Sequence, residues 1–147
     1  MTVAETIHAS AVVIGERAAI IRGPSGSGKS RLVLALLQAA QTGLLPYAKL
    51  IADDRVKIAA AHGRLVVSPP DTIRGMIEVR GLGIRASAYE PLAVAGLVID
   101  LAADDAARMP ENMTTKLLDI SLPRLPIGAD VEPLPIVLAA LSTAPKG

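Results

Sequence analysis

The 147-residue chain contains no cysteine, no tryptophan and no phenylalanine, and its only aromatic residues are two tyrosines. Without cysteine it forms no disulfide framework and no thiolate zinc site, and it has no thiol nucleophile. With so few aromatic side chains it lacks a platform on which nucleic-acid bases could stack. These absences exclude several common chemistries before any motif is considered.

A strong charge of either sign is also lacking, because 15 Lys and Arg residues face 14 Asp and Glu residues, for a net charge of +1. Such a balance argues against broad electrostatic binding to nucleic acid. The longest mainly apolar run, Leu92–Ile99, is about eight residues, whereas a membrane helix needs about 20. The N-terminus shows no basic start followed by an apolar run. We therefore expect a cytoplasmic protein that binds neither nucleic acid nor membrane.

The length fits one domain over residues 1–147, and the hydrophobic fraction of 51% is enough for a core. Short apolar runs separated by turns predict many strands, and helical spacing predicts one clear helix over Lys29–Ala40. A short helix is expected over Ile136–Leu141. Residues 102–126 are expected to be mostly loop, with a short strand near Leu117–Ile120. The expected strands cover residues 9–14, 18–21, 47–52, 56–61, 64–68, 77–79, 84–88 and 92–101.

The strongest local signal is a glycine-rich loop between an expected strand and the long helix. It matches the G-x-x-x-x-G-K-[ST] pattern in full, which is typical of phosphate-binding loops. Backbone amides in such a loop, and the positive end of the following helix, bind phosphate groups. Lys29 can neutralise the β- and γ-phosphates, and the Ser30 hydroxyl can ligate Mg²⁺. The pattern does not separate kinase, GTPase and ATPase activity. Its residues are Gly23, Pro24, Ser25, Gly26, Ser27, Gly28, Lys29 and Ser30.

Two adjacent carboxylates, Asp53 and Asp54, end the apolar run Leu50–Ala52. A carboxylate at the end of a strand commonly holds Mg²⁺ near a phosphate-binding loop. One of the pair can hold the metal while the other accepts the proton of an attacking hydroxyl. The alternative is a polar strand end that leads into a turn.

Three other polar residues have less specific patterns. Glu78 lies inside an apolar strand, where it needs either a metal or an arginine partner, and Arg80 and Arg85 are near in sequence. From the residues alone, His8 is an ordinary solvated histidine. Arg108 lies in a polar, proline-containing loop, where exposed arginine is ordinary, although a loop arginine can also act on a transferring phosphoryl group.

In combination, these motifs resemble the catalytic domain of the HPr kinase/phosphorylase family, whose members phosphorylate a serine of the phosphocarrier protein HPr. The resemblance rests on four features in the family's order. His8 stands 15 residues before Gly23, and the loop Gly23–Ser30 has the family's Gly-x-Ser-Gly-x-Gly-Lys-Ser form. The segments Leu50–Val56 and Ile77–Ile84 then resemble the family's Asp-Asp segment and its Glu-Ile-Arg-Gly-Leu-Gly-Ile signature.

The resemblance implies a strand-rich α/β nucleotide-binding core, similar to phosphoenolpyruvate carboxykinase, that uses ATP and Mg²⁺. It implies that Lys29 and the loop amides bind the phosphates and that Ser30 and Glu78 bind Mg²⁺, together with Asp53 from the reasoning above. It also implies that Asp54 takes the proton from the attacking serine and that His8 and Arg108 support catalysis. We accordingly expect an Mg²⁺-dependent serine kinase acting on an HPr-like phosphocarrier protein.

The chain departs from the family's pattern in several places. Pro24 and Arg31 replace the family's usual Asp and Glu. Residues 122–128 lack the segment linked to dephosphorylation, which leaves phosphorylase activity open. We expect no room for the family's additional N-terminal domain. The C-terminal helices that help to build the family's hexamer are expected to be short, which leaves the state of any homo-oligomer open. A small-molecule kinase and a non-catalytic nucleotide-sensing module remain as alternatives.

Overall fold

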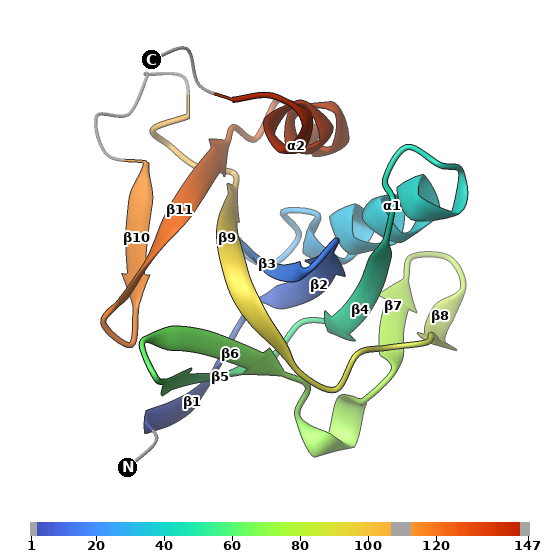
Figure 1. Ribbon diagram of the computed structural model, residues 1–147. Helices are drawn as coiled ribbons and strands as arrows, with labels where there is room; N and C mark the ends of the chain where they lie inside the picture. Colours follow the sequence, from blue (N-terminus) through green and yellow to red (C-terminus); the bar gives the residue numbers. More distant parts are fainter. Residues whose placement is uncertain (1–2, 107–112, 145–147) are drawn as a thin grey trace.

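The computed structural model describes residues 3–106 and 113–144, and strands dominate it (Figure 1). Two α-helices, α1 (Lys29–Gln41) and α2 (Pro133–Ser142), and one 3₁₀ turn, η1 (Asp71–Ile73), complete the described elements. The strands are β1 (Val3–Ile7), β2 (Ser10–Ile14), β3 (Arg17–Arg22), β4 (Ala48–Ala52), β5 (Val56–Ala61), β6 (Arg64–Ser68), β7 (Met76–Val79), β8 (Gly83–Ala86), β9 (Ala93–Leu101), β10 (Thr114–Leu117) and β11 (Ile120–Ile127).

In the main sheet, four strands have their carboxyl ends at the same edge: β3, β4, β9 and β11. Its order is β1-β5-β6-β9-β3-β2-β4, with β11 paired to β9 and β10 paired to β11. β9 runs parallel to both β3 and β11. β4 also points the same way as β3, because both are antiparallel to β2, which lies between them. In α/β sheets, ligands bind beyond the carboxyl ends of such strands.

Apolar residues fill both faces of the central strands. On β3, Ala18 and Ile20 belong to one buried cluster, whereas Ala19 and Ile21 belong to the other. Side chains alternate between the two faces of a strand, so a strand covered on both sides reads as an unbroken apolar run. This double burial fixes the strand ends that carry the polar residues described below.

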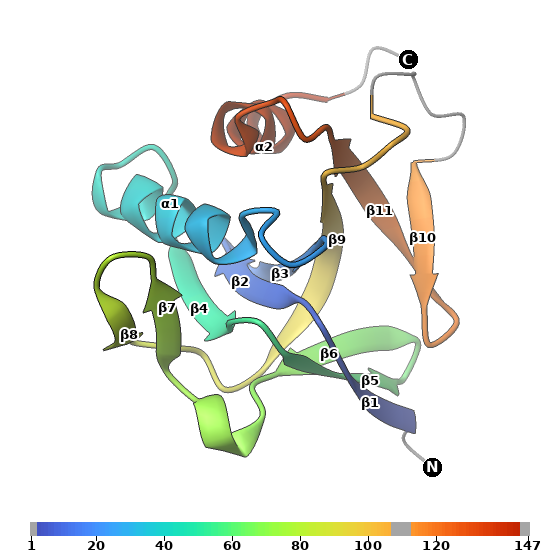
Figure 2. The same cartoon turned by 180° about the vertical axis from the view of Figure 1, so that it is seen from behind.

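Helices α1 and α2 lie together on one face of the main sheet. Strands β1, β5 and β6 form one end of that sheet, away from the two helices (Figures 1 and 2). α1 is held there by buried side chains at helical spacing, including Leu32, Val33 and Leu36. The small β7–β8 hairpin packs against α1 through Ile77. The first turn of α1 is therefore anchored between the sheet and this hairpin.

Most expected elements are present, including the β5–β6 hairpin, whose turn residues His62 and Gly63 have φ values of 53° and 76°. The expectation that residues 102–126 are mostly loop is wrong for residues 114–126. β10 and β11 form a hairpin there, and Leu117–Ile120 contains its turn rather than a strand. The strand β1 is also present without having been expected. In the described ranges, no helix is long and apolar enough to cross a membrane.

Candidate functional site

The glycine-rich loop (residues 23–28) joins the end of β3 to α1 and requires glycine for two reasons. At Gly23, a Cβ atom would lie 2.5 Å from the Ser27 Oγ and 3.2 Å from the carbonyl oxygen of Leu101. Gly26 and Gly28 have φ values of 82° and 100°, in the region that only glycine adopts without strain. The packing and the backbone together hold the loop against the ends of β3 and β9.

Lys29, the first residue of α1, folds back over the loop. Its Nζ donates hydrogen bonds to the carbonyl oxygens of Gly23 at 2.8 Å and Pro24 at 3.3 Å. The buried Ser27 Oγ has no hydrogen-bond partner in the described part of the chain. A loop with a lysine ammonium, an unpartnered hydroxyl and a helix N-terminus has the chemistry of an anion site.

Asp53, at the end of β4, is the centre of a hydrogen-bond network in which none of the described residues is a cationic partner. Its side chain is buried, and its Oδ1 accepts hydrogen bonds from the Ser10 hydroxyl at 2.9 Å and the Ser30 hydroxyl at 2.7 Å. Its Oδ2 accepts the backbone N–H of Glu78 at 3.0 Å. One carboxylate thus connects β2, the first turn of α1 and β7.

Asp54 differs from its neighbour in almost every respect. It is exposed, its φ is 71°, and its carboxylate accepts no hydrogen bond from the described residues. Its backbone N–H donates to the Ser10 Oγ at 3.0 Å. The sequence predicted different roles for the two carboxylates, and the structure gives them different environments. The Asp53 carboxylate is buried and hydrogen-bonded, whereas the Asp54 carboxylate is exposed and accepts no hydrogen bond from the described residues.

Two further residues named from the sequence are positioned by these strands. His8 is exposed, and it follows Ile7, whose pairing with Val56 places His8 beside the Asp53–Arg55 segment. Glu78 is exposed on β7, so the expectation that it needs either a metal or an arginine partner is wrong, and in the described residues it forms no ion pair with either nearby arginine. Arg108 lies outside the described residues.

The oxygen donors near the loop fit a magnesium ion. Mg²⁺ is usually held by one or two carboxylates together with waters and substrate phosphates. Here the Ser30 hydroxyl touches Asp53, and Glu78 is tied to the same carboxylate through its backbone. Among the described residues, no three or more His, Cys, Asp or Glu side chains are grouped so that they could hold a metal ion. The arrangement therefore fits a metal completed by phosphate oxygens and water better than an all-protein site.

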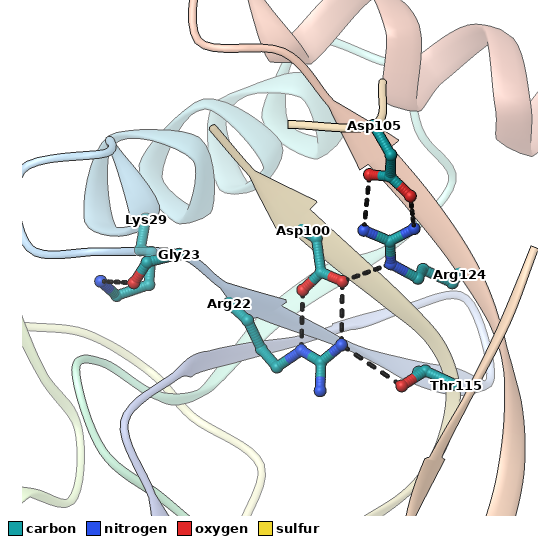
Figure 3. Close-up of polar contacts among 7 residues, drawn as sticks. All are labelled: Arg22, Gly23, Lys29, Asp100, Asp105, Thr115 and Arg124. Atoms are coloured by element: carbon teal, nitrogen blue, oxygen red, sulfur yellow. Dashed lines mark hydrogen bonds and ion pairs between the residues drawn. The ribbon is translucent and has the colours of Figure 1, made fainter. Parts of the chain in front are cut away.

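A second network lies on the other side of the loop, around Asp100 at the end of β9 (Figure 3). Arg22 donates to both carboxylate oxygens of Asp100, at 2.7 and 2.8 Å, and Arg124 donates to one of them at 2.6 Å. Arg124 also binds Asp105 through two hydrogen bonds, at 2.8 and 3.0 Å. Arg22 reaches Thr115 on β10. These contacts connect β3, β9, β10, β11 and the segment after β9.

The charges of this second network change its titration. Burial acts to raise the pKa of Asp100, but the hydrogen bonds and charges of Arg22 and Arg124 outweigh it and hold the pKa below its ordinary value of 3.8. The pKa of Asp105 is lowered by Arg124 in the same way. The pKa of Arg124 is raised by its two carboxylate partners. Asp100 is thus an ionised carboxylate whose charge is already compensated.

Sequence reasoning missed Ser10 and the Asp100 network, although both left a signal. Ser10 is the one hydroxyl in the apolar run Ala9–Ile14. Arg22 and Asp100 each end an apolar run, as Asp53 does, and they pair in register on β3 and β9. Polar residues that follow buried strands were therefore informative beyond the aspartate pair.

Comparison with known proteins places these features in a family. The profile of the HPr Serine kinase C-terminal domain matches residues 1–88, more than half of the chain. An HPr kinase/phosphorylase of Geobacillus thermodenitrificans is 34% identical over 134 residues, covering 82% of this chain and 41% of that protein. An HPr kinase/phosphorylase of Clostridium tetani is 43% identical over 65 residues, covering 44% of this chain and 19% of that protein.

The fold is also that of a solved structure, the Hpr(Ser) kinase/phosphatase from Coxiella burnetii. The TM-score is 0.74 at 23% identity, with 93% of this chain and 86% of that chain covered. At this identity the likeness shows the fold alone, and it confirms the expected strand-rich α/β core. The chain spans about two fifths of the length of the Geobacillus relative.

Proposed function

This chain belongs to the HPr serine kinase C-terminal domain family, and on that premise we propose that it is an ATP- and Mg²⁺-dependent protein serine kinase that acts on an HPr-like phosphocarrier protein. The observation that carries the proposal is the 2.7 Å hydrogen bond between Ser30 and Asp53. It joins the first turn of α1, which follows the glycine-rich loop, to a buried carboxylate that has no cationic partner among the described residues. The use of ATP places the proposed reaction in the cytoplasm.

In this proposal, the residues of the loop bind and orient the nucleotide. The loop amides and Lys29 contact its phosphates. To do so, the Lys29 ammonium gives up its hydrogen bonds to the carbonyl oxygens of Gly23 and Pro24 and binds phosphate oxygens instead. Ser30, Asp53 and Glu78 would hold Mg²⁺. When bound, the nucleotide supplies the γ-phosphoryl group and the metal offsets its negative charge. Most of the rate acceleration then comes from positioning and charge compensation.

Asp54 is the proton acceptor in this proposal. The oxygen of the substrate serine forms a bond to the γ-phosphorus while the bond from that phosphorus to the bridging oxygen of ATP breaks, leaving ADP. The hydroxyl proton passes to the Asp54 carboxylate, which is exposed and unbonded and so is free to receive it. His8, beside the Asp53–Arg55 segment, and Arg108 are proposed to support this step.

The test is phosphate transfer from ATP labelled at the γ-position to purified HPr-type proteins. We expect serine labelling by the wild-type protein and, for Asp54→Asn, a loss of about 10²–10⁴-fold in transfer rate. Nucleotide affinity of the variant should stay within about threefold, because the phosphate-binding residues are untouched. Lys29→Ala is the contrasting variant, since it should weaken nucleotide binding itself.

Two results separate the alternatives. A wild-type protein that binds ATP and labels a metabolite but no protein would contradict the protein kinase assignment and favour a small-molecule kinase. Binding without any transfer, together with an Asp54→Asn variant that behaves as wild type, would favour a nucleotide-sensing module. Release of phosphate from the serine-phosphorylated carrier, assayed in parallel, reports whether the chain also has phosphorylase activity.

A further inference from the structure

Ser10, the first residue of β2, places a fully buried hydroxyl against both members of the aspartate pair. Its relative exposure is 0%. The Oγ donates a hydrogen bond to the Asp53 Oδ1 at 2.9 Å and accepts one from the Asp54 backbone N–H at 3.0 Å. A hydroxyl offers one donor and two acceptor positions, so the donor is fully used on Asp53 and an acceptor on Asp54.

The two bonds of Ser10 differ in how far other residues duplicate them. Asp53 has two further donors, the Ser30 hydroxyl and the Glu78 backbone N–H. For the Asp54 backbone N–H, the Ser10 hydroxyl is the acceptor in the described structure. Loss of the hydroxyl would therefore leave Asp53 held by two groups, whereas the Asp54 amide would lose its acceptor and the turn would keep only the bond from the Arg55 N–H to the Asp53 carbonyl oxygen, at 2.8 Å.

The backbone of Asp54 needs such support. Its φ of 71° lies in the left-handed region, which residues with a Cβ adopt less readily than glycine, although aspartate adopts it more often than most of them. Strained conformations persist only where the surroundings hold them, and they occur preferentially at functional sites. The direction of the Asp54 side chain follows from this backbone conformation, because its carboxylate has no hydrogen bond of its own to the described residues.

We propose that Ser10 is a positioning residue, whose hydroxyl fixes the left-handed backbone of Asp54 and so sets where the Asp54 carboxylate lies for proton transfer. This inference rests on the proposed function, which assigns that transfer to Asp54. The bond to Asp53 ties the two carboxylates to the same hydroxyl, so that the proton acceptor keeps a fixed relation to the proposed metal site.

The first test is local and needs no enzymatic activity. In Ser10→Ala, hydrogen exchange of the Asp54 amide should accelerate by about tenfold or more, because the buried acceptor is gone. Amides of β3 and β9 should keep their exchange rates. Ser121→Ala, which makes the same substitution at an exposed position of β11, is the matched control. If Ser10→Ala does not fold, Ser10→Cys supplies a side chain of similar size with only weak hydrogen-bonding capacity.

The second test asks whether Ser10 acts through Asp54. Ser10→Ala should lower kcat by about 10–100-fold while nucleotide affinity stays within about threefold. In the Asp54→Asn background, the same substitution should change the residual rate by less than about twofold, because the group that it positions is already lost. If Ser10 had a merely structural role, its substitution would lower the rate by the same factor in both backgrounds.

Failure of this inference is distinguishable from failure of the proposed function. Unchanged exchange at the Asp54 amide in Ser10→Ala, or an equal loss of rate in both backgrounds, would overturn the role of Ser10. If wild type labels no carrier protein, the proposed substrate is wrong. The role of Ser10 is then decided by the hydrogen-exchange measurement and by the double-mutant cycle of Ser10→Ala with Asp54→Asn, in which the measured rate is that of ATP hydrolysis with water as acceptor.

Discussion

Asp53 and Asp100 lie on opposite sides of the glycine-rich loop, and each ends a strand that points the same way as β3, yet their partners differ completely. Asp53 receives two hydroxyl groups and a backbone N–H. Asp100 receives three hydrogen bonds from two arginines. Neutral donors satisfy the lone pairs of a carboxylate but leave its charge uncompensated, whereas arginine forks compensate it.

This difference in partners suits the two carboxylates to different roles. An uncompensated carboxylate beside the glycine-rich loop still attracts a cation, which is why we propose Asp53 for metal binding. The charge of Asp100 is compensated by two arginines, and its hydrogen bonds connect the ends of β3, β9 and β11. We therefore propose that metal binding belongs to the Asp53 side of the loop and that the Asp100 network stabilises the strand ends.

Asp100→Ala should have the largest effect on stability. Asp100 and Arg124 have side chains only 15% and 17% exposed, and removing the carboxylate leaves arginine charges without their partner. We expect a loss of about 2–4 kcal/mol in the free energy of unfolding, measured by urea denaturation. Asp105→Ala is the comparison variant and should cost under about 1 kcal/mol, because Asp105 is 46% exposed and Arg124 keeps Asp100. Equal stability of Asp100→Ala and wild type would contradict this stabilising role of the Asp100 network.

The same network should make stability depend on pH in the acid range. A carboxylate whose pKa is lowered by folding contributes stability that is fully present above its ordinary pKa of 3.8 and is lost as the pH falls through the folded value. Wild type should therefore lose stability more steeply than Asp100→Asn between about pH 5 and pH 3. Urea denaturation across that range measures it, and parallel curves would contradict the sign assigned to Asp100.

The smallest effect is expected at the exposed ion pair between Arg31 and Glu132, whose side chains are 72% and 61% exposed. Arg31→Ala should change the free energy of unfolding by less than about 0.5 kcal/mol, because solvent screens such pairs. The midpoint of thermal unfolding, compared with that of Asp100→Ala, gives the measurement. A change as large as that of Asp100→Ala would show that burial does not distinguish the two ion-pair networks.

Local signals explain which parts of the molecule could be predicted from sequence. The glycine-rich loop and the His62-Gly63 turn were predictable, because glycine at fixed positions reports backbone conformation directly. The β10–β11 hairpin was not. Its turn uses Leu118 and Asp119 with φ values of 48° and 62°, without any glycine, and prolines interrupt β11.

The candidate site shows the same limit. The residues of the loop and the aspartate pair follow from local motifs, but the hydrogen bonds that distinguish the two aspartates include those of Ser10, which lies 43 residues before Asp53. The Asp100 network likewise joins Arg22 to a residue 78 positions away. Such contacts are set by strand register, which a single sequence does not fix at the level of individual side chains.

The most direct test of the account compares Asp53→Asn with Asp100→Asn by calorimetric titration of ATP with and without Mg²⁺. We expect Mg²⁺ to strengthen ATP binding to wild type and to Asp100→Asn by the same factor. In Asp53→Asn, the apparent affinity for Mg²⁺ should fall by about 10–100-fold, because the carboxylate charge beside Ser30 is lost. An Asp53→Asn variant with wild-type Mg²⁺ dependence, or an equal loss in Asp100→Asn, would contradict the assignment of the metal to the Asp53 side.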